Sequence, residues 1–189
     1  MKQARGDRPY FIFRQVQLDK SKRGLVMGTI NPLHIKELIR LINSSPFFRN
    51  LSMVIETIET GLCIITIDIE EKHLSPYAAI QGGVYPAIID AAAYWAPYPE
   101  LPEDVGLITM DVSVNYTASV KDGRIIARGE RIKTGRTICL SQVLVHDDEG
   151  KVLAQGTSKL LVTRGLQTIP HITGYSAESM PAKFLDDGE

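Results

Sequence analysis

The sequence predicts an α+β domain in which an antiparallel sheet wraps around one long buried helix. Two patterns carry this prediction. Residues 82–96, GGVYPAIIDAAAYWA, are apolar on almost every side, as in a helix that has neighbours all round it. The segments before and after them alternate apolar with polar residues between short turns, which is typical of antiparallel strands. Because one small sheet covers only part of such a helix, we expect a second subunit to cover the rest.

The chain before the central helix contains one shorter helix and one hairpin. Asn31 is a favourable N-cap, Pro32 suits the first turn, and apolar residues follow at helical spacing until an Asn-Ser-Ser-Pro run ends the helix. Residues 51–60 and 62–70 are predicted strands, and Gly61 belongs to the hairpin turn between them.

Four strands are predicted after the central helix, which Pro97 and Pro99 end. Turns rich in glycine and aspartate separate them, so successive strands are expected to pair as antiparallel hairpins. Their ranges are 110–117, 124–133, 137–146 and 151–163.

The composition fits one domain with an extension at each end. The chain has 189 residues, of which 44% are hydrophobic and 23% charged, as in a compact domain with an ordinary core. We expect an N-terminal arm over residues 1–30 and a single domain over residues 31–164. A C-terminal tail rich in Gly, Pro and Ser follows over residues 165–189.

Charge and residue usage argue against several classes of partner. A formal net charge of -1 gives no strong field for a nucleic acid or a membrane. No apolar stretch is long enough to span a bilayer, and residues 1–20 lack the apolar core of a signal peptide, so a cytoplasmic protein is expected. Cys63 and Cys139 lie far apart in apolar runs and the histidines are isolated, so we expect buried thiols, no metal and no other cofactor.

Asp90 is the only acidic or basic residue of the central helix. A carboxylate among apolar side chains is costly unless it is paired, hydrogen-bonded or protonated, so Asp90 is either a functional acid or a structural residue at a subunit seam. Gly82 and Gly83 open the same helix, where free N–H groups without a nearby Cβ would let a substrate oxygen approach, as in an oxyanion hole. The glycine pair equally fits a tight turn from strand to helix.

One combination of residues is more specific than any single motif. It joins His-Leu-Ser-Pro at 73–76, Gln-Gly-Gly at 81–83, Asp90 and the three alanines that follow. This combination resembles the hotdog thioesterases of the phenylacetate-degradation type, and the resemblance covers roughly residues 35–163, the size of one domain. It implies the hotdog fold, acyl-CoA thioesterase activity, and a homodimer or homotetramer.

The resemblance also implies roles for individual residues. Asp90 matches the family's acidic residue, which acts as nucleophile or general base, and the N–H groups of Gly82 and Gly83 match the pair that polarises the thioester carbonyl. In this family the glycines of one subunit often face the acid of the other. Gln81 stands where His is usual and is interpreted as a positioning residue, because an amide donates hydrogen bonds but carries no proton. Ser75 stands where Asn often contacts the carboxylate or the attacking water.

Two further residues are candidate substrate contacts. Thr109 falls near a small hydroxyl position that helps to hold the attacking water in some members, although strand alternation groups it with Asp111 and Ser113. Arg136 follows Gly135 in a turn that resembles one near the entrance for CoA, and arginine suits phosphate by geometry. A surface charge on a hairpin turn is the alternative for Arg136.

Three functions are consistent with these residues. Hydrolysis of an acyl-CoA to free acid and CoA is favoured, because the carboxylate and both glycines are present. A hotdog hydro-lyase, acting on hydroxyacyl or enoyl thioesters, usually needs a His–acid pair, and Gln81 replaces the usual histidine. A non-catalytic acyl-CoA-binding domain is the third candidate, and the presence of Asp90 argues against it.

Overall fold

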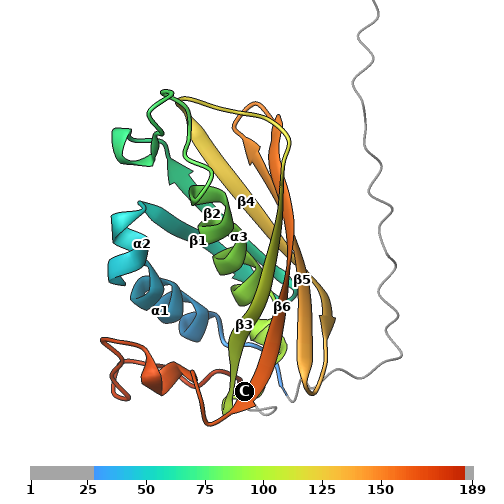
Figure 1. The fold of residues 1–189 in the computed structure, drawn as a ribbon. Coiled ribbons are helices and arrows are strands. Elements are labelled where there is room, and N and C mark those ends of the chain that lie inside the picture. Colours follow the sequence, from blue (N-terminus) through green and yellow to red (C-terminus); the bar gives the residue numbers. More distant parts are fainter. Residues whose placement is uncertain (1–27, 186–189) are drawn as a thin grey trace, which may run out of the picture.

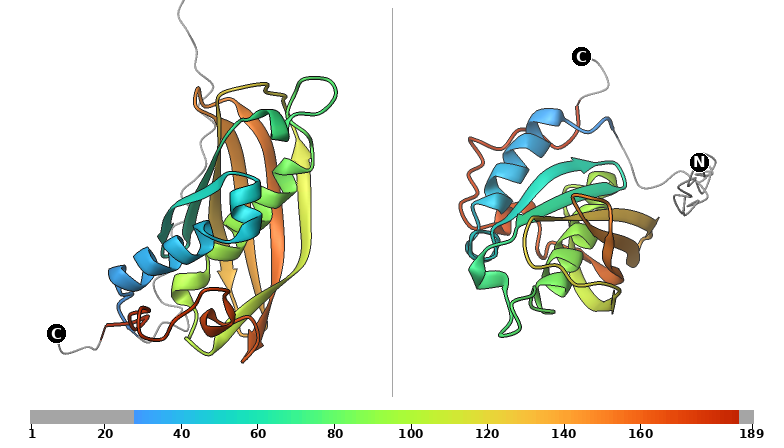
Figure 2. Two further views of the ribbon diagram at one scale, coloured as in Figure 1. Left: turned by 90° about the vertical axis from the view of Figure 1, so that its left-hand side faces the viewer. Right: turned by 90° about the horizontal axis from the view of Figure 1, so that it is seen from above.

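An antiparallel sheet curves around the helix α3 (Val84–Trp95) in the computed structural model, which describes residues 28–185 (Figures 1 and 2). The strand order is β1-β2-β4-β5-β6-β3, and the predicted α+β hotdog fold is confirmed. Residues 1–27, most of the predicted N-terminal arm, lie outside the described residues. The strands are β1 (Met53–Glu59), β2 (Leu62–Asp68), β3 (Val105–Tyr116), β4 (Arg124–Thr134), β5 (Ile138–Asp147) and β6 (Val152–Arg164).

The helix α3 packs one broad face directly against the sheet. Ile88, Ile89 and Ala92 on this face are completely buried. Two sheet glycines make the contact possible: a Cβ on Gly129 would lie 2.4 Å from the carbonyl oxygen of Ala92, and one on Gly156 would lie 2.9 Å from the Ile89 side chain. The backbones of helix and strands therefore approach more closely than any side chain at these positions would allow.

The prediction of successive hairpins was wrong at one connection. The segment after β3 does not turn back to form a hairpin with β4, because β4 pairs with β2 and β3 pairs with β6. This arrangement inserts the last three strands between β2 and β3, so the sheet becomes wide enough to curve around α3. Alternation alone predicts that a segment is a strand, and it does not choose the strand's neighbours.

Two short helices precede the sheet. The predicted start of α1 (Pro32–Asn43) is confirmed, since the side-chain oxygen of Asn31 accepts a hydrogen bond from the Leu33 N–H at 3.0 Å. The next helix, α2 (Pro46–Asn50), was not predicted and is only one turn and a half long. Both helices pack against β1, and α2 brings Phe47 and Phe48 towards the face of α3 that the sheet leaves uncovered.

The segment after β6 runs back beside α1 and is tied to the domain (Figures 1 and 2). Apart from the short 3-10 helix η3 (Ile169–His171) it has no regular structure longer than a bridge. Lys183 is its anchor and is only 1% exposed. Its Nζ donates hydrogen bonds to the backbone oxygens of Tyr98 (2.9 Å) and Leu101 (2.6 Å), and lies 3.7 Å from the centre of the Tyr98 ring.

The two cysteines are buried, as expected from the apolar runs that contain them. Cys63 and Cys139 are both buried and free, and burial raises the pKa of each thiol. Within residues 28–185 no helix is long and apolar enough to cross a membrane. The same range contains no cluster of three or more His, Cys, Asp or Glu side chains that could hold a metal ion.

Burial also makes the anchor sensitive to pH. Loss of hydration lowers the pKa of Lys183 to about 7, although the carboxylate of Glu103 acts in the opposite direction. In the unfolded chain a lysine titrates near pH 10, so between these values the unfolded chain binds more protons than the folded protein, and stability rises with pH. His34 and Tyr98 also face this site, and the pKa of His34 is lowered by its burial.

We predict that Lys183→Met removes this contribution. Between pH 8 and 10, the free energy of unfolding of the wild type should rise relative to that of the variant, by up to about 1.4 kcal/mol per pH unit. Urea unfolding followed by circular dichroism measures both curves. The matched control is Lys36→Met at an exposed lysine of α1, whose curve should stay parallel to the wild type. Parallel curves for Lys183→Met would contradict a shifted lysine.

Candidate active site

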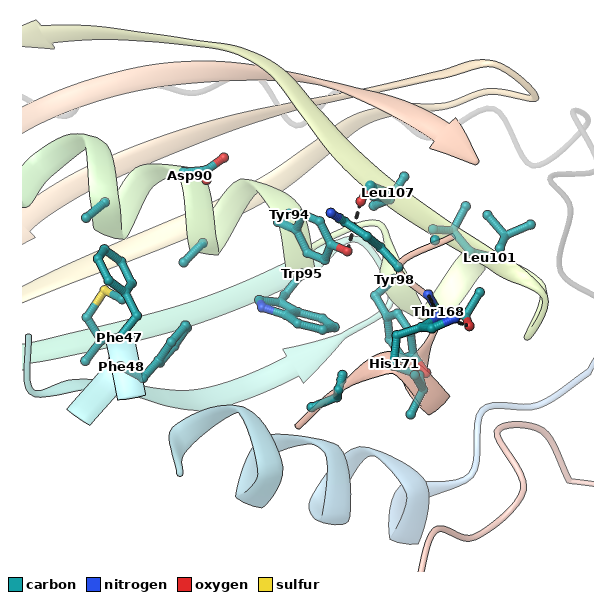
Figure 3. A pocket seen from close by; sticks show the side chains of 18 residues that line it. Phe47, Phe48, Asp90, Tyr94, Trp95, Tyr98, Leu101, Leu107, Thr168 and His171 are labelled. Carbon is teal, nitrogen blue, oxygen red and sulfur yellow. Dashed lines mark hydrogen bonds between the residues drawn. The ribbon is translucent and has the colours of Figure 1, made fainter. Parts of the chain in front are cut away.

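Asp90 lies on α3 at the border between the buried face and the face that the sheet leaves open (Figure 3). Its Oδ1 accepts a hydrogen bond from the Thr109 hydroxyl at 2.8 Å. Burial raises the pKa of Asp90 above its ordinary value, and the Thr109 hydrogen bond partly offsets this. Among the described residues, no basic side chain forms an ion pair with Asp90. A carboxylate held in this way is more basic than one in water.

A β-bulge brings Thr109 to Asp90. The pairing of β3 with β6 shifts register between Thr109 and Asp111, so the expected alternation, which grouped Thr109 with Asp111 and Ser113, was wrong at this point. A bulge places an extra residue on one strand and reverses the facing of those before it. Before the bulge, Leu107 and Thr109 therefore face α3. After the bulge, Val112 and every second residue that follows it face α3.

Gly82 and Gly83 lie where α3 begins, as predicted. Gly83 is the N-cap, and the Gly82 carbonyl accepts a hydrogen bond from the Tyr116 hydroxyl at 3.1 Å. Within residues 28–185, neither glycine N–H donates a hydrogen bond to a protein group. A Cβ on Gly83 would meet nothing within 4 Å, so the space beside this residue is open. These free N–H groups at a helix N-terminus can donate hydrogen bonds to a negatively polarised oxygen.

Within one chain, the glycines and Asp90 lie too far apart to act on the same thioester group. Gly83 and Asp90 are seven residues apart on one helix, which corresponds to about 10 Å along its axis. Reacting atoms must lie about 3 to 3.5 Å apart in a productive complex. A thioester whose carbonyl oxygen lies on these N–H groups would therefore be out of reach of the same chain's carboxylate.

Ser75, Gln81 and His73 belong to the loop that precedes α3. The Ser75 hydroxyl accepts a hydrogen bond from the Tyr77 N–H at 3.3 Å and makes none with Asp90. Gln81 is exposed, and its N–H donates to the His73 carbonyl at 2.8 Å. His73 is completely buried: its Nδ1 accepts from the Glu70 N–H and its Nε2 donates to the Leu51 carbonyl, each at 2.9 Å. The histidine therefore supports the loop and has no free nitrogen for proton transfer.

Arg136 is exposed in the turn between β4 and β5 and takes part in none of the ion pairs found within residues 28–185. This turn lies at the C-terminal end of α3, because the Thr134 hydroxyl donates a hydrogen bond to Glu100, which follows the helix. Arg136 is thus available to a charged ligand, and the described contacts give it no structural role.

An apolar cavity of about 370 Å³ runs along the open face of α3 from Asp90 (Figure 3). The helix contributes Ala91, Tyr94 and Trp95 to its wall. Tyr94 lies four residues after Asp90, and this helical spacing already indicates in the sequence that the two residues share a face. The cavity wall also includes the segment after β6, which no sequence motif had indicated.

Comparison with known proteins gives the same architecture. Residues 78–154 match the family described as the Thioesterase superfamily. The chain is 22% identical over 103 residues to the 1,4-dihydroxy-2-naphthoyl-CoA hydrolase of Listeria monocytogenes, covering 54% of this chain and 84% of that protein.

Solved structures of other proteins share the fold, among them two thioesterases. The thioesterase of Haemophilus influenzae superposes with a TM-score of 0.65 at 22% identity, covering 70% of this chain and 92% of that one. A mutant thioesterase of Pseudomonas aeruginosa superposes with a TM-score of 0.63 at 16% identity, covering 68% and 93%. Over residues 78–154 the chain is therefore similar to the Thioesterase superfamily, and its domain shares the hotdog fold of these thioesterases.

Proposed function

We propose that the protein is an acyl-CoA thioesterase that hydrolyses a thioester to the free acid and CoA. The observation that carries this proposal is the position of Asp90, a hydrogen-bonded carboxylate without an ionic partner at the wall of an apolar cavity. The named activity of the Listeria relative, an acyl-CoA hydrolase, supports it. Assignment to the phenylacetate-degradation type is part of the proposal and rests on the pattern between His73 and Asp90.

The chemistry assigns separate tasks to the N-terminal end of α3 and to Asp90 in the middle of the helix. The N–H groups of Gly82 and Gly83 bind the carbonyl oxygen and stabilise the negative charge that it gains when the carbonyl carbon is attacked. Asp90 either takes a proton from the attacking water or attacks the carbon itself to form an anhydride, which water then opens. In both routes the C–S bond breaks, and the thiolate of CoA leaves and takes up a proton. Thr109 holds the carboxylate in place.

The distance between the glycines and Asp90 supports an assembly of at least two subunits. A second chain can place its glycines beside the first chain's carboxylate, which completes two equivalent sites in a symmetric dimer. β3 offers an edge for such a dimer, since it pairs with β6 on one side and with no described strand on the other. Gln81 and Ser75 then shape the loop beside the carbonyl site, and Arg136 binds a phosphate of CoA.

The alternative functions have less support. A hydro-lyase needs a histidine beside the acid, and His73 has both nitrogens committed to the backbone. His171 lies in the cavity wall, yet at the opposite end from Asp90 (Figure 3). A non-catalytic binding domain would have no need of a desolvated carboxylate.

Replacement of Asp90 tests the proposed activity. Asp90→Ala should lower kcat on the order of a hundredfold or more, because no other described acid lines the cavity. Asp90→Asn should also lose activity while keeping the shape of the side chain. Thiol release from a panel of acyl-CoAs measures the rates, and circular dichroism checks folding. Asp122→Asn, in an exposed turn, is the matched control. Near-normal kcat in folded Asp90→Ala would refute the mechanism.

Thr109→Val tests how the carboxylate is held. The active form of Asp90 is ionised, so activity should fall at low pH as the carboxylate gains a proton. Because the Thr109 hydrogen bond lowers the pKa of Asp90, its removal should move the acid limb of the kcat/KM profile to higher pH. The exposed Thr137→Val should leave the limb in place. An unmoved limb in Thr109→Val would show that the hydroxyl does not act on the ionised acid.

A pair of substitutions tests the shared site. Gly83→Pro removes the N–H at a backbone φ of -65° that proline accepts, and Gly83→Ala keeps the N–H and has room for its Cβ. We expect a loss of kcat of about a hundredfold or more for proline alone.

Mixing the two inactive variants then shows whether the glycines and the acid of one site come from different chains. Refolded mixtures of Gly83→Pro and Asp90→Ala chains should regain about a quarter of wild-type activity, because half of the dimers combine one intact glycine end with one intact acid. No activity is recovered if both groups act within one chain.

Light scattering should show that the protein is a dimer or tetramer. A monodisperse, active monomer would refute the assembly.

A further inference from the structure

The cavity beside Asp90 is long, apolar and walled by rings. It follows α3 from Ala87 to Trp95, about 12 Å of helix, and continues past the helix end. Five aromatic residues line it, namely Phe47, Phe48, Tyr94, Trp95 and Tyr98. An apolar cavity of about 150 Å³ holds one benzene molecule, so 370 Å³ suits a group of about two fused rings.

Three of these rings form a fixed row. The Tyr94 and Trp95 rings meet edge to face at 4.9 Å, and the Trp95 and Tyr98 rings do so at 5.5 Å. The Tyr94 hydroxyl is turned away to the Leu107 carbonyl at 3.1 Å, and the Tyr98 hydroxyl is hydrogen-bonded to His34 Nε2 at 2.6 Å. Rings that are held in this way offer a planar ligand edges and faces without first having to rearrange.

The end of the cavity opposite Asp90 is closed by the segment after β6 (Figure 3). Thr168, Ile169 and Ile172 form this wall. The segment lies directly against the start of β3, because a Cβ on Gly106 would be 2.0 Å from the Leu166 carbonyl oxygen. Thr168 is fixed in turn by His171, whose Nδ1 lies 3.0 Å from the Thr168 hydroxyl.

Residues 165–185 also contact the other residues at the end of the cavity opposite Asp90. Lys183 donates to the carbonyls of Tyr98 and Leu101, and both of these residues line the cavity. Asn31 and His34 bind the carbonyls of Ala182 and Pro181 at 2.9 and 2.8 Å. All of these contacts come from residues 165–185, which follow the part of the chain that matches the superfamily.

We propose that residues 165–185 form the end wall of an acyl-binding cavity and make the enzyme selective for compact, ring-bearing acyl groups over long straight chains. This inference rests on the proposed thioesterase function, because Asp90 at the near end fixes where the thioester carbon lies. The acyl group then extends along the row of rings, and its length is limited by Thr168. A chain longer than the cavity meets the anchored segment and cannot bring its carbonyl to Asp90.

Binding can be followed without hydrolysis, because Trp95 is the only tryptophan of the chain. Its fluorescence should change saturably when naphthoate, the free acid of a two-ring acyl group, is added. Dodecanoate should bind about tenfold or more weakly. Equal affinity for the two acids would overturn the inference.

Two substitutions test the wall itself. Thr168→Phe fills the far end and should weaken naphthoate binding by about tenfold or more, whereas Thr173→Phe, an exposed residue of the same segment, should not. Lys183→Met releases the wall and should strengthen dodecanoate binding. If that variant does not fold, Ile172→Ala, which shortens the wall, should have the same effect. Unchanged affinities in Thr168→Phe, or in the folded opening variant, would refute the end wall.

Hydrolysis assays distinguish a failure of the end-wall proposal from a failure of the proposed thioesterase function. The wild type should cleave naphthoyl-CoA with a higher kcat/KM than dodecanoyl-CoA, and Lys183→Met or Ile172→Ala should narrow the difference. Selective binding of naphthoate without cleavage of any acyl-CoA would refute the proposed function and leave the cavity assignment standing. Cleavage of both thioesters at equal rates would refute the end wall and leave the thioesterase function standing.

Discussion

Direct contact between the backbone of α3 and the backbone of the sheet is the constraint on which the rest of the structure depends. Gly129 leaves no side chain between β4 and the backbone of Ala92, and Gly156 leaves room for the Ile89 side chain against β6. The helix therefore lies close against the sheet. Its depth decides that Asp90 lies at the border of the buried face, where loss of water raises its pKa while one side stays open to a ligand.

The open face of α3 has a different kind of cover. α2 contributes phenylalanines and the segment after β6 contributes Thr168 and Ile169, so this side encloses a cavity where the other encloses a packed core. The division has a simple origin. A sheet can meet a helix along its whole length, whereas short irregular segments touch it only at intervals and leave space between the contacts.

Those parts of the fold and site that depend on local pattern were predictable. The N-cap at Asn31, the extent of α3 and the unusual position of Asp90 all follow from residues within a few turns of each other. Thr109 was placed on the wrong side of its strand, because the bulge at Met110 depends on how β3 pairs with β6 some fifty residues later. The neighbours of β3 and β4 were mistaken for the same reason. The role of the C-terminal segment was hidden because Lys183 bonds to residues more than eighty positions away.

The anchor at Lys183 has a consequence for the order in which the protein is built. Every strand, the helix α3 and the acid itself precede this residue in the chain, so they leave the ribosome before it does. A nascent chain can fold its sheet around α3 while the cavity still has an open end. Contacts between residues far apart in sequence form slowly, because the entropy of closing a long loop is lost before the contact is made. We therefore expect the cavity to close after the sheet has folded around α3.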